Sequence, residues 1–301
     1  MKLNYKRVVL VGMAFFLISA FWQAYDAIVP LILTNHFGMP QTASGAVMSL
    51  DNVLAVFMLP IFGALSDRVN TRLGKRTPFI TIGTIVAAVA LLGLSFVDNA
   101  QLQNLSCASK IDDMHALEMI YDTQADKELM TPDGEKFILS DEFTKEEFMT
   151  ITSQIADPEN ADKKITNPDY TNYVAPARQA YAADQTRANP MPLIFFVAVL
   201  LVLLVGMGGF RSMATYRSPA VSLMPTVTAK PLRSKANAVI NLMGTAGGIL
   251  VLVLGMGFAF GISSAKNAMM SYLPYYLAIA GIMIAALVVF LCTVKEKEWV
   301  A

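Results

Sequence analysis

Six long apolar stretches constrain the fold of this chain more than any other feature of its sequence. They cover residues 8–34, 43–65, 78–97, 192–213, 237–262 and 272–294. Because a helix rises about 1.5 Å per residue, about 20 apolar residues are enough to cross the hydrocarbon core of a bilayer. The stretches therefore predict an all-α membrane protein with six transmembrane helices.

The composition agrees with this prediction and disfavours several other classes of protein. Hydrophobic residues make up 55% of the 301 residues and charged residues 15%, with a mean hydropathy of +0.50. A typical soluble domain is roughly 45–50% apolar and about 25% charged. A soluble enzyme, a disordered tail and a nucleic-acid binder are therefore disfavoured, and we expect no catalytic residues and no cofactor. The two cysteines, Cys107 and Cys292, give neither a disulfide framework nor a metal site.

A formal net charge of zero hides two oppositely charged parts of the chain. Residues 98–190 hold 18 acidic and 8 basic residues and so carry a charge of −10, whereas the remaining residues carry +10. We interpret 98–190 as an acidic extracytoplasmic insert. It separates residues 1–97, with transmembrane helices 1–3, from residues 191–301, with helices 4–6.

Four local patterns predict the structure of the insert. Residues 112–129 are typical of an acidic amphipathic helix, Thr131 to Gly134 of a turn, and Ser140 of a second helix start, while residues 157–190 predict a loop rich in Pro, Asn and Asp. The acidity can serve calcium or a cationic ligand. No carboxylate spacing matches a calcium loop, so a solvated surface is the favoured interpretation.

The basic residues predict how the helices are oriented in the membrane. Fourteen of the fifteen Lys and Arg residues outside the insert lie at the N-terminus, between helices 2 and 3, between helices 4 and 5, or after helix 6. Only Lys266 lies in a loop on the other side. Since basic residues accumulate in cytoplasmic loops, we expect a multi-pass protein of the plasma membrane, in contact with lipid, with both termini cytoplasmic.

Two acidic residues, Asp26 and Asp51, lie within the predicted spans. A carboxylate there is costly and is by default a functional candidate. Each lies about 12 Å below the outer surface, on neighbouring helices. Two desolvated carboxylates close together favour binding of a proton. We therefore predict Asp26 and Asp51 as cation-coupling residues, with helix packing as the alternative.

Side chains that suit a sugar lie on the same face of the first span. Trp22, Asp26 and Pro30 follow a spacing of four residues, with Gln23 beside them. Pro30 lacks an N–H group, which frees the carbonyl of Asp26. In the fifth span Gly244 and Gly248 allow close helix approach, and the asparagines are either substrate contacts or packing amides. The predicted substrate-binding residues are Trp22, Gln23, Asp26, Asn52, Asn237 and Asn241.

The loop between the second and third spans carries the strongest motif. It reads Gly63-Ala-Leu-Ser-Asp67-Arg68, then Arg72-Leu-Gly74-Lys75-Arg76. Asp67 at a helix end among four cations can form charge-assisted pairs that hold two helices together. The predicted gating motif is therefore Gly63, Asp67, Arg68, Arg72, Gly74, Lys75 and Arg76. A loop that only sets topology explains its arginines but neither Gly63 nor Asp67.

This loop resembles the signature cytoplasmic loop of the major facilitator superfamily. The longer form, Ser66-Asp-Arg-x-x-x-Arg-x-Gly-Lys-Arg-x-Pro-Phe-Ile80, is similar to the version in sucrose transporters, which stand close to the glycoside–pentoside–hexuronide cation symporters. Residues 29–31, 37–40 and 235–244 resemble the same branch. The resemblance covers all six spans but not the insert.

The resemblance implies twelve helices in two six-helix halves, with the substrate bound between the halves. The residues outside the insert are too few for twelve spans. We therefore expect the N-terminal half of a cation-coupled, proton-driven sugar symporter. Its second half is missing here or supplied by another chain.

The sequence also departs from the sucrose branch. Val221 and Thr226 stand where that branch has Arg and Asp, although Arg217 is nearby. The substrate and the coupling site are therefore not fixed by the resemblance. Two alternatives remain: a non-transporting membrane subunit or receptor whose external insert binds a partner, and a major facilitator exporter of another small molecule.

Overall fold

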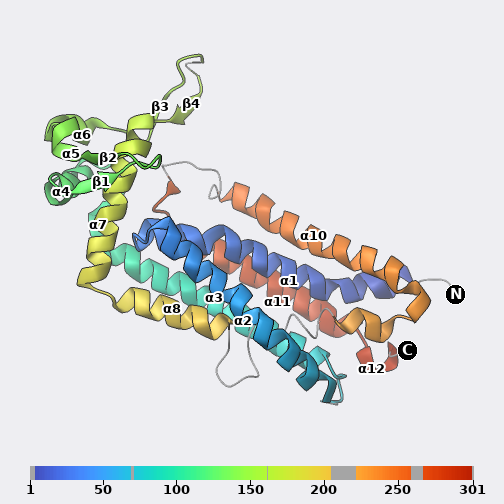
Figure 1. Cartoon of the computed structure of the whole chain (residues 1–301). Coiled ribbons are helices and arrows are strands. Elements are labelled where there is room, and N and C mark those ends of the chain that lie inside the picture. The colour runs from blue at the N-terminus through green and yellow to red at the C-terminus, as the bar shows by residue number, and fades with distance from the viewer. Residues whose placement is uncertain (1–3, 69–70, 161, 205–221, 259–266, 300–301) are drawn as a thin grey trace.

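The computed structural model describes residues 4–68, 71–160, 162–204, 222–258 and 267–299. Long helices run side by side as a bundle, and the insert forms a smaller unit at one end of it (Figure 1). The N-terminus and the short C-terminal helix α12 (Glu296–Trp299) lie at the opposite end. We call these two ends of the bundle the insert end and the termini end.

Six long helices make up the described bundle. They are α1 (Tyr5–Leu31), extended by the π-helical turn η1 (Ile32–His36), α2 (Gln41–Arg68), α3 (Thr77–Asn104), α8 (Met191–Leu204), α10 (Arg233–Gly257) and α11 (Leu273–Thr293). Residues 222–227 are also helical, and η4 (Lys230–Leu232) leads into α10. Helix α1 packs on α10 and α11, α3 packs on α11 and α8, and α2 also contacts α1.

Helices that can cross a membrane dominate the described residues. Four pass by length and hydropathy, and a fifth does so if α7 and α8, which meet at 89°, count as one span. Helix α2 covers the second predicted stretch, while the fourth runs into residues outside those described. The chain is therefore a multi-pass, predominantly helical membrane protein, and the number six, the plasma membrane and the cytoplasmic termini stay predictions.

Helix α1 lies at the centre of the apolar core. Its side chains Leu17, Phe21, Ala24, Tyr25 and Ile28 are completely buried. The outer helices instead expose large apolar side chains along their lengths, as lipid-facing helices do. The polar residues Trp22, Gln23 and Asp26 lie on the remaining face of α1, which is partly exposed.

Close packing of α1 against α10 depends on glycine. A Cβ atom on Gly247 would lie 2.5 Å from the carbonyl oxygen of Phe16, and one on Gly244 would lie 2.9 Å from Ser19 Oγ. A Cβ on Gly248 would lie at an ordinary 3.7 Å from Gln23 Oε1. The tightest approach is therefore at Gly247, which the spacing argument did not single out.

The insert folds around its own apolar core, which includes Phe148 and Tyr170. Its elements are η2 (Ser106–Ser109), α4 (Met114–Gln124), β1 (Glu128–Met130), β2 (Lys136–Ile138), α5 (Leu139–Glu142), α6 (Lys145–Thr150), β3 (Gln154–Ala156), β4 (Lys164–Thr166), η3 (Tyr170–Val174) and α7 (Ala175–Ala188). The strands form two antiparallel hairpins, β1–β2 and β3–β4.

The expected boundary after residue 97 falls inside α3. The helix continues to Asn104, and its polar residues Asp98 and Gln101 are completely buried in the structure. The apolar run ends at residue 97, but the helix does not, because polar side chains with buried partners continue it. The insert proper therefore begins after Asn104.

Two expectations for the insert are confirmed in outline. Helix α4 lies within residues 112–129 and is capped by Asp113. The turn is present, with Gly134 at φ +91° and its N–H donating to the Thr131 carbonyl at 3.0 Å. A short helix, α5, begins at Leu139, next to the helix start expected at Ser140, whereas the helix that carries Glu146 to Phe148 begins at a capping box formed by Thr144 and Glu147.

The loop expected over residues 157–190 is also wrong for its second half. Residues from Tyr170 to Ala188 form η3 and α7. Pro176 stands in the first turn of α7, where a missing N–H costs nothing, and five alanines favour the helix that follows. Tyr170 and Tyr181 are buried in the core of the insert, so tertiary packing stabilises the helix.

Alanine at Gly247 tests the packing of α1 on α10. We expect Gly247→Ala to lower the free energy of unfolding by about 1–3 kcal/mol, because its Cβ overlaps backbone that cannot move freely. Gly248→Ala is the matched control and should be neutral or stabilising by up to about 1 kcal/mol, since alanine favours helix. Unfolding in detergent micelles measures both, and equal stabilities would contradict the packing argument.

Candidate functional site

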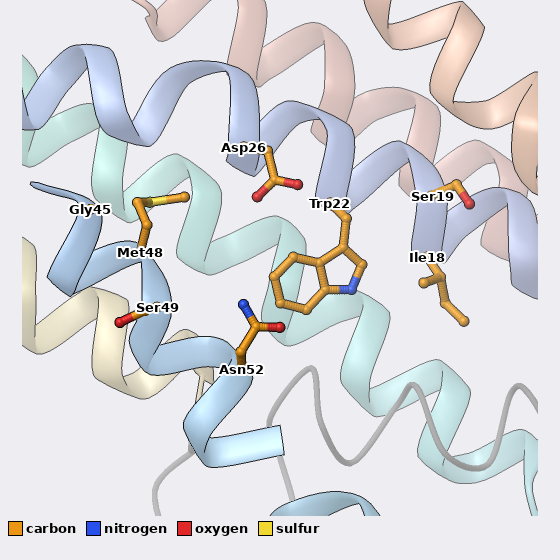
Figure 2. Close-up of a pocket in the computed structure, with 8 residues that line it drawn as sticks. All are labelled: Ile18, Ser19, Trp22, Asp26, Gly45, Met48, Ser49 and Asn52. Carbon is orange, nitrogen blue, oxygen red and sulfur yellow. The ribbon is translucent and has the colours of Figure 1, made fainter. Parts of the chain in front are cut away.

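One face of α1 borders two cavities. The first, of about 650 Å³, lies between α1 and α2 and is lined by Ile18, Ser19, Trp22, Asp26, Gly45, Met48, Ser49 and Asn52. Figure 2 shows Trp22 and Asp26 from α1 facing Asn52 from α2 across it. The second, of about 630 Å³, lies between α1 and α10, and its polar lining is Ser19, Trp22, Gln23, Asp26, Asn241 and Thr245. The two cavities share Ser19, Trp22 and Asp26.

The Trp22 ring is held by aromatic packing. It meets Phe21 and Tyr25 edge to face, with ring centroids 5.4 Å apart in both pairs. Both neighbours are completely buried, so they fix the plane of the indole. Within the described part of the chain the indole N–H has no hydrogen-bond partner. The indole nitrogen itself is buried, so Trp22 offers a flat apolar face one helical turn from the exposed carboxylate of Asp26.

Five of the six predicted substrate-binding residues line these cavities: Trp22, Gln23, Asp26, Asn52 and Asn241. Asn237 is exposed on α10 one turn before Asn241 and lines neither cavity. Asp51 lies in α2 next to Asn52, but its side chain is outside the described part. The positions of Arg217 and Val221 also lie outside the described residues.

Helix α1 does not break at Pro30. It continues to Leu31 and then widens into the π-helical turn η1. The Thr34 hydroxyl donates to the Pro30 carbonyl at 2.9 Å. The irregular backbone of this helix thus lies after the proline, toward His36.

At the termini end, the loop before α3 encloses a carboxylate. The backbone N–H groups of Lys75, Arg76 and Thr77 donate to Glu296 at 2.9, 3.1 and 2.9 Å, and the Thr77 hydroxyl donates at 2.7 Å. Glu296 is only 1% exposed although it belongs to the C-terminal α12. The first N–H groups of a helix lack partners within the helix and favour negative charge, so Glu296 satisfies the start of α3.

Gly74 makes this enclosure possible. Its φ is +120°, and a Cβ there would lie only 2.2 Å from Glu296 Oε2. Of the predicted gating motif, Gly74, Lys75 and Arg76 thus take part through their backbone, while Arg68 and Arg72 are exposed. The side chain of Asp67 and the surroundings of Gly63 lie outside the described part, so the pairing of Asp67 with cations stays a prediction.

Sequence reasoning missed three buried ionisable residues. They are His36, Asp98 and Glu296, none of which is among the predicted site residues, and Asp98 falls within the predicted insert 98–190. The structure buries all three, and it places His36 Nδ1 2.5 Å from Asp98 Oδ1. A signal for Asp98 exists in hindsight, because Asp98 and Gln101 are one turn apart in a run without a helix breaker.

The acidic surface of the insert is partly neutralised by its own lysines. Lys145 lies 2.9 Å from Glu118 and 2.8 Å from Asp122, and it holds the pKa of Glu118 below its usual range. Among the described residues no group of three or more His, Cys, Asp or Glu side chains could hold a metal ion. Cys107 and Cys292 are not joined to each other.

Comparison with known proteins adds a family resemblance for the first three helices. Residues 10–103 match the family model described as MFS/sugar transport protein. That region carries α1, α2 and nearly all of α3, and hence the first cavity and the enclosing loop. No solved structure matches the chain.

Characterised relatives point in the same direction. Proton-associated sugar transporter A of Homo sapiens and that of Mus musculus are each 35% identical over 74 residues, which is 25% of this chain and 9% of each relative. The matched segment thus spans less than a tenth of the length of these relatives. The resemblance to major facilitator sugar transporters expected from the loop motif is confirmed for the N-terminal region.

Neutralising Glu296 tests the enclosure. We expect Glu296→Gln to lower stability by about 1–3 kcal/mol, because hydrogen bonds from three backbone N–H groups lose their charged acceptor. Amide hydrogen exchange at residues 75–77 should accelerate accordingly. Glu298→Gln is the matched control, since Glu298 is exposed and, among the described residues, pairs with Lys295 at 3.3 Å, and it should change stability by less than about 0.5 kcal/mol. Equal effects would refute the role of Glu296.

Proposed function

We propose that the chain is the N-terminal half of a secondary active transporter that moves a sugar together with a cation, a proton in our assignment. The observation that carries this is the face of α1 with Trp22 and Asp26, flanked by the amides of Asn52 and Asn241. This face lies in, or directly against, the region that resembles MFS/sugar transport proteins.

The chemistry of the cavities suits a sugar. A carboxylate and amides can each bind a pair of neighbouring hydroxyl groups, and the indole face packs on the apolar face of a pyranose ring. In this proposal Trp22, Gln23, Asp26, Asn52, Asn237 and Asn241 bind substrate, with Asn237 at the margin.

Coupling to a cation is assigned to Asp26 and Asp51. Asp26 is exposed to both cavities, so that its protonation can depend on whether substrate is present. The name of the relatives, proton-associated sugar transporter, favours a proton over sodium. The gating motif between α2 and α3 would open and close the termini end.

A second six-helix half completes the proposed transporter. Asp26, Asn52 and Asn241 are exposed on the bundle, beside large apolar side chains such as Leu242 at 68% exposure. Ionisable groups facing lipid are costly, so a cover of complementary polar side chains is required. That cover is the second half, in the same chain or in another.

The folded insert favours one alternative. Because it has its own apolar core, it can act as a binding module, which would make the chain a non-transporting receptor or subunit. An exporter of another small molecule remains the other alternative, since fold does not fix substrate.

Sugar-driven proton uptake in proteoliposomes tests the proposal, with the chain in the context of its second half. We expect Asp26→Asn to abolish coupled proton uptake, and Trp22→Ala to raise the apparent KM about tenfold, which corresponds to about 1.4 kcal/mol of lost stacking.

Two asparagines one turn apart provide the matched control. Asn241→Ala should weaken sugar binding several-fold, whereas Asn237→Ala should change it less, because only Asn241 lines a cavity. Normal coupled uptake in Asp26→Asn would remove Asp26 from the coupling mechanism. If the wild type takes up none of the sugars tested, the proposed substrate class is wrong.

A further inference from the structure

A buried histidine–aspartate pair lies at the insert end of the bundle. His36 is the last residue of η1, and Asp98 lies on α3. Nδ1 of the histidine is 2.5 Å from Oδ1 of the aspartate, and both side chains are 0% exposed. Neither residue lines the cavities assigned to the sugar.

The pair joins four segments that are distant in the sequence. His36 Nε2 lies 3.2 Å from the carbonyl oxygen of Ala268, which precedes α11. The Gln101 amide donates both to the His36 carbonyl at 2.9 Å and to the Thr186 hydroxyl of α7 at 3.0 Å. The ends of α1 and α3, the insert and the start of α11 therefore meet at one buried polar cluster.

Hydrogen-bond chemistry fixes how many protons this arrangement holds. A backbone carbonyl only accepts, so Nε2 must carry the hydrogen in its contact with Ala268. The contact between Nδ1 and Oδ1 then needs a proton of its own, carried by either atom. Removing that proton from His36 and Asp98 leaves two lone pairs opposed in one of the two contacts. The observed geometry thus fits the pair with one proton bound.

Burial adds to this preference. With the proton the pair is neutral overall, whereas without it a net negative charge remains where neither side chain reaches water. Asp98 Oδ2 is also buried and accepts no hydrogen bond within the described ranges. An unpaired buried charge costs several kcal/mol, so losing the proton disfavours this closed arrangement.

Other titratable groups around the pair do not replace that proton. From α11, Tyr272 stacks on the His36 ring with centroids 5.5 Å apart, and Tyr276 lies one turn further on. Tyrosine side chains are neutral near pH 7, because the ordinary pKa of a phenol is about 10.

The charged residues of α7 have partners within the insert. Arg178 donates to the carbonyls of Ala108 and Lys110, and Asp184 pairs with Lys127. The described residues of α8, α11 and η2 include no charged side chain. The first charged residue of α2 is Asp51, ten residues after the start of that helix. Lys266 lies outside the described part.

We propose that His36 and Asp98 form a proton-binding site whose loading closes the insert end of the bundle. Loss of the proton would separate the two side chains and release the end of α1 from α3 and α7. The site is additional to Asp26 and Asp51. Its link to transport rests on the proposed function, whereas proton binding itself does not.

The chain has two histidines, which makes the proton directly observable. Histidine-labelled chain in lipid nanodiscs should show a low-field proton resonance from the Nδ1–Oδ1 hydrogen bond and a protonated Nε2. Both should persist at about pH 8, where a free imidazole with its ordinary pKa of about 6.5 has lost its extra proton. His115, whose side chain is 89% exposed, is the internal reference.

Two variants separate the site from its surroundings. His115→Gln should leave the low-field resonance unchanged, and Asp98→Asn should remove it. Absence of the resonance in the wild type between about pH 6 and pH 8, or its survival in Asp98→Asn, would overturn the proposal. Even if Asp98→Asn does not fold, the wild-type spectrum alone decides whether the pair holds the shared proton.

Hydrogen exchange tests the closing of the insert end. After correction for intrinsic rates, protection of residues 36–39 and 179–186 should fall at least about tenfold as the shared proton is lost, which corresponds to 1.4 kcal/mol. The double variant His36→Gln with Asp98→Asn should show protection independent of pH. If protection in the wild type does not depend on pH, proton binding does not close the insert end. Failure of sugar uptake leaves these readouts unchanged, so failure of the proposed function is distinguishable.

Discussion

The cost of a carboxylate in apolar surroundings governs the arrangement of this molecule. Three acids illustrate three ways of meeting that cost. Glu296 accepts hydrogen bonds from backbone N–H groups at the start of α3. Asp98 pairs with the buried ring of His36, and Asp26 faces an open cavity. The first two are buried against partners inside the described chain, whereas the third is exposed where a substrate or a partner half can reach it.

These three positions lie along the bundle in an informative order. Glu296 ties the C-terminal helix to the loop between α2 and α3 at the termini end, and His36 with Asp98 ties α1 to α3 and the insert at the other end. The cavities border α1 between these ties. In the proposed transporter, access to the sugar alternates between the ends, so a polar contact at each end that can form and break is the element such a cycle needs.

Much of this could be read from the sequence, and the failures share a cause. Apolar length predicted the long helices, and the four-residue spacing of Trp22 and Asp26 predicted a shared face, because both depend on local helix geometry. The loop motif predicted the resemblance but not its carboxylate, since Glu296 comes from more than 200 residues away. Asp98 was misassigned because hydropathy reports the end of an apolar run and not the end of a helix, and α7 was missed because its stability comes from packing.

The sequence by itself determined that the chain is a helical membrane protein and which polar residues share the face of α1. Only the tertiary structure decided which side chains meet across helices: Asn52 and Asn241 on either side of Trp22, Glu296 in the turn formed by Gly74, and His36 against Asp98. The reason is physical. Helical period and hydropathy act over a few turns, whereas the pairing of buried polar groups depends on which distant segments the packing brings within hydrogen-bond distance.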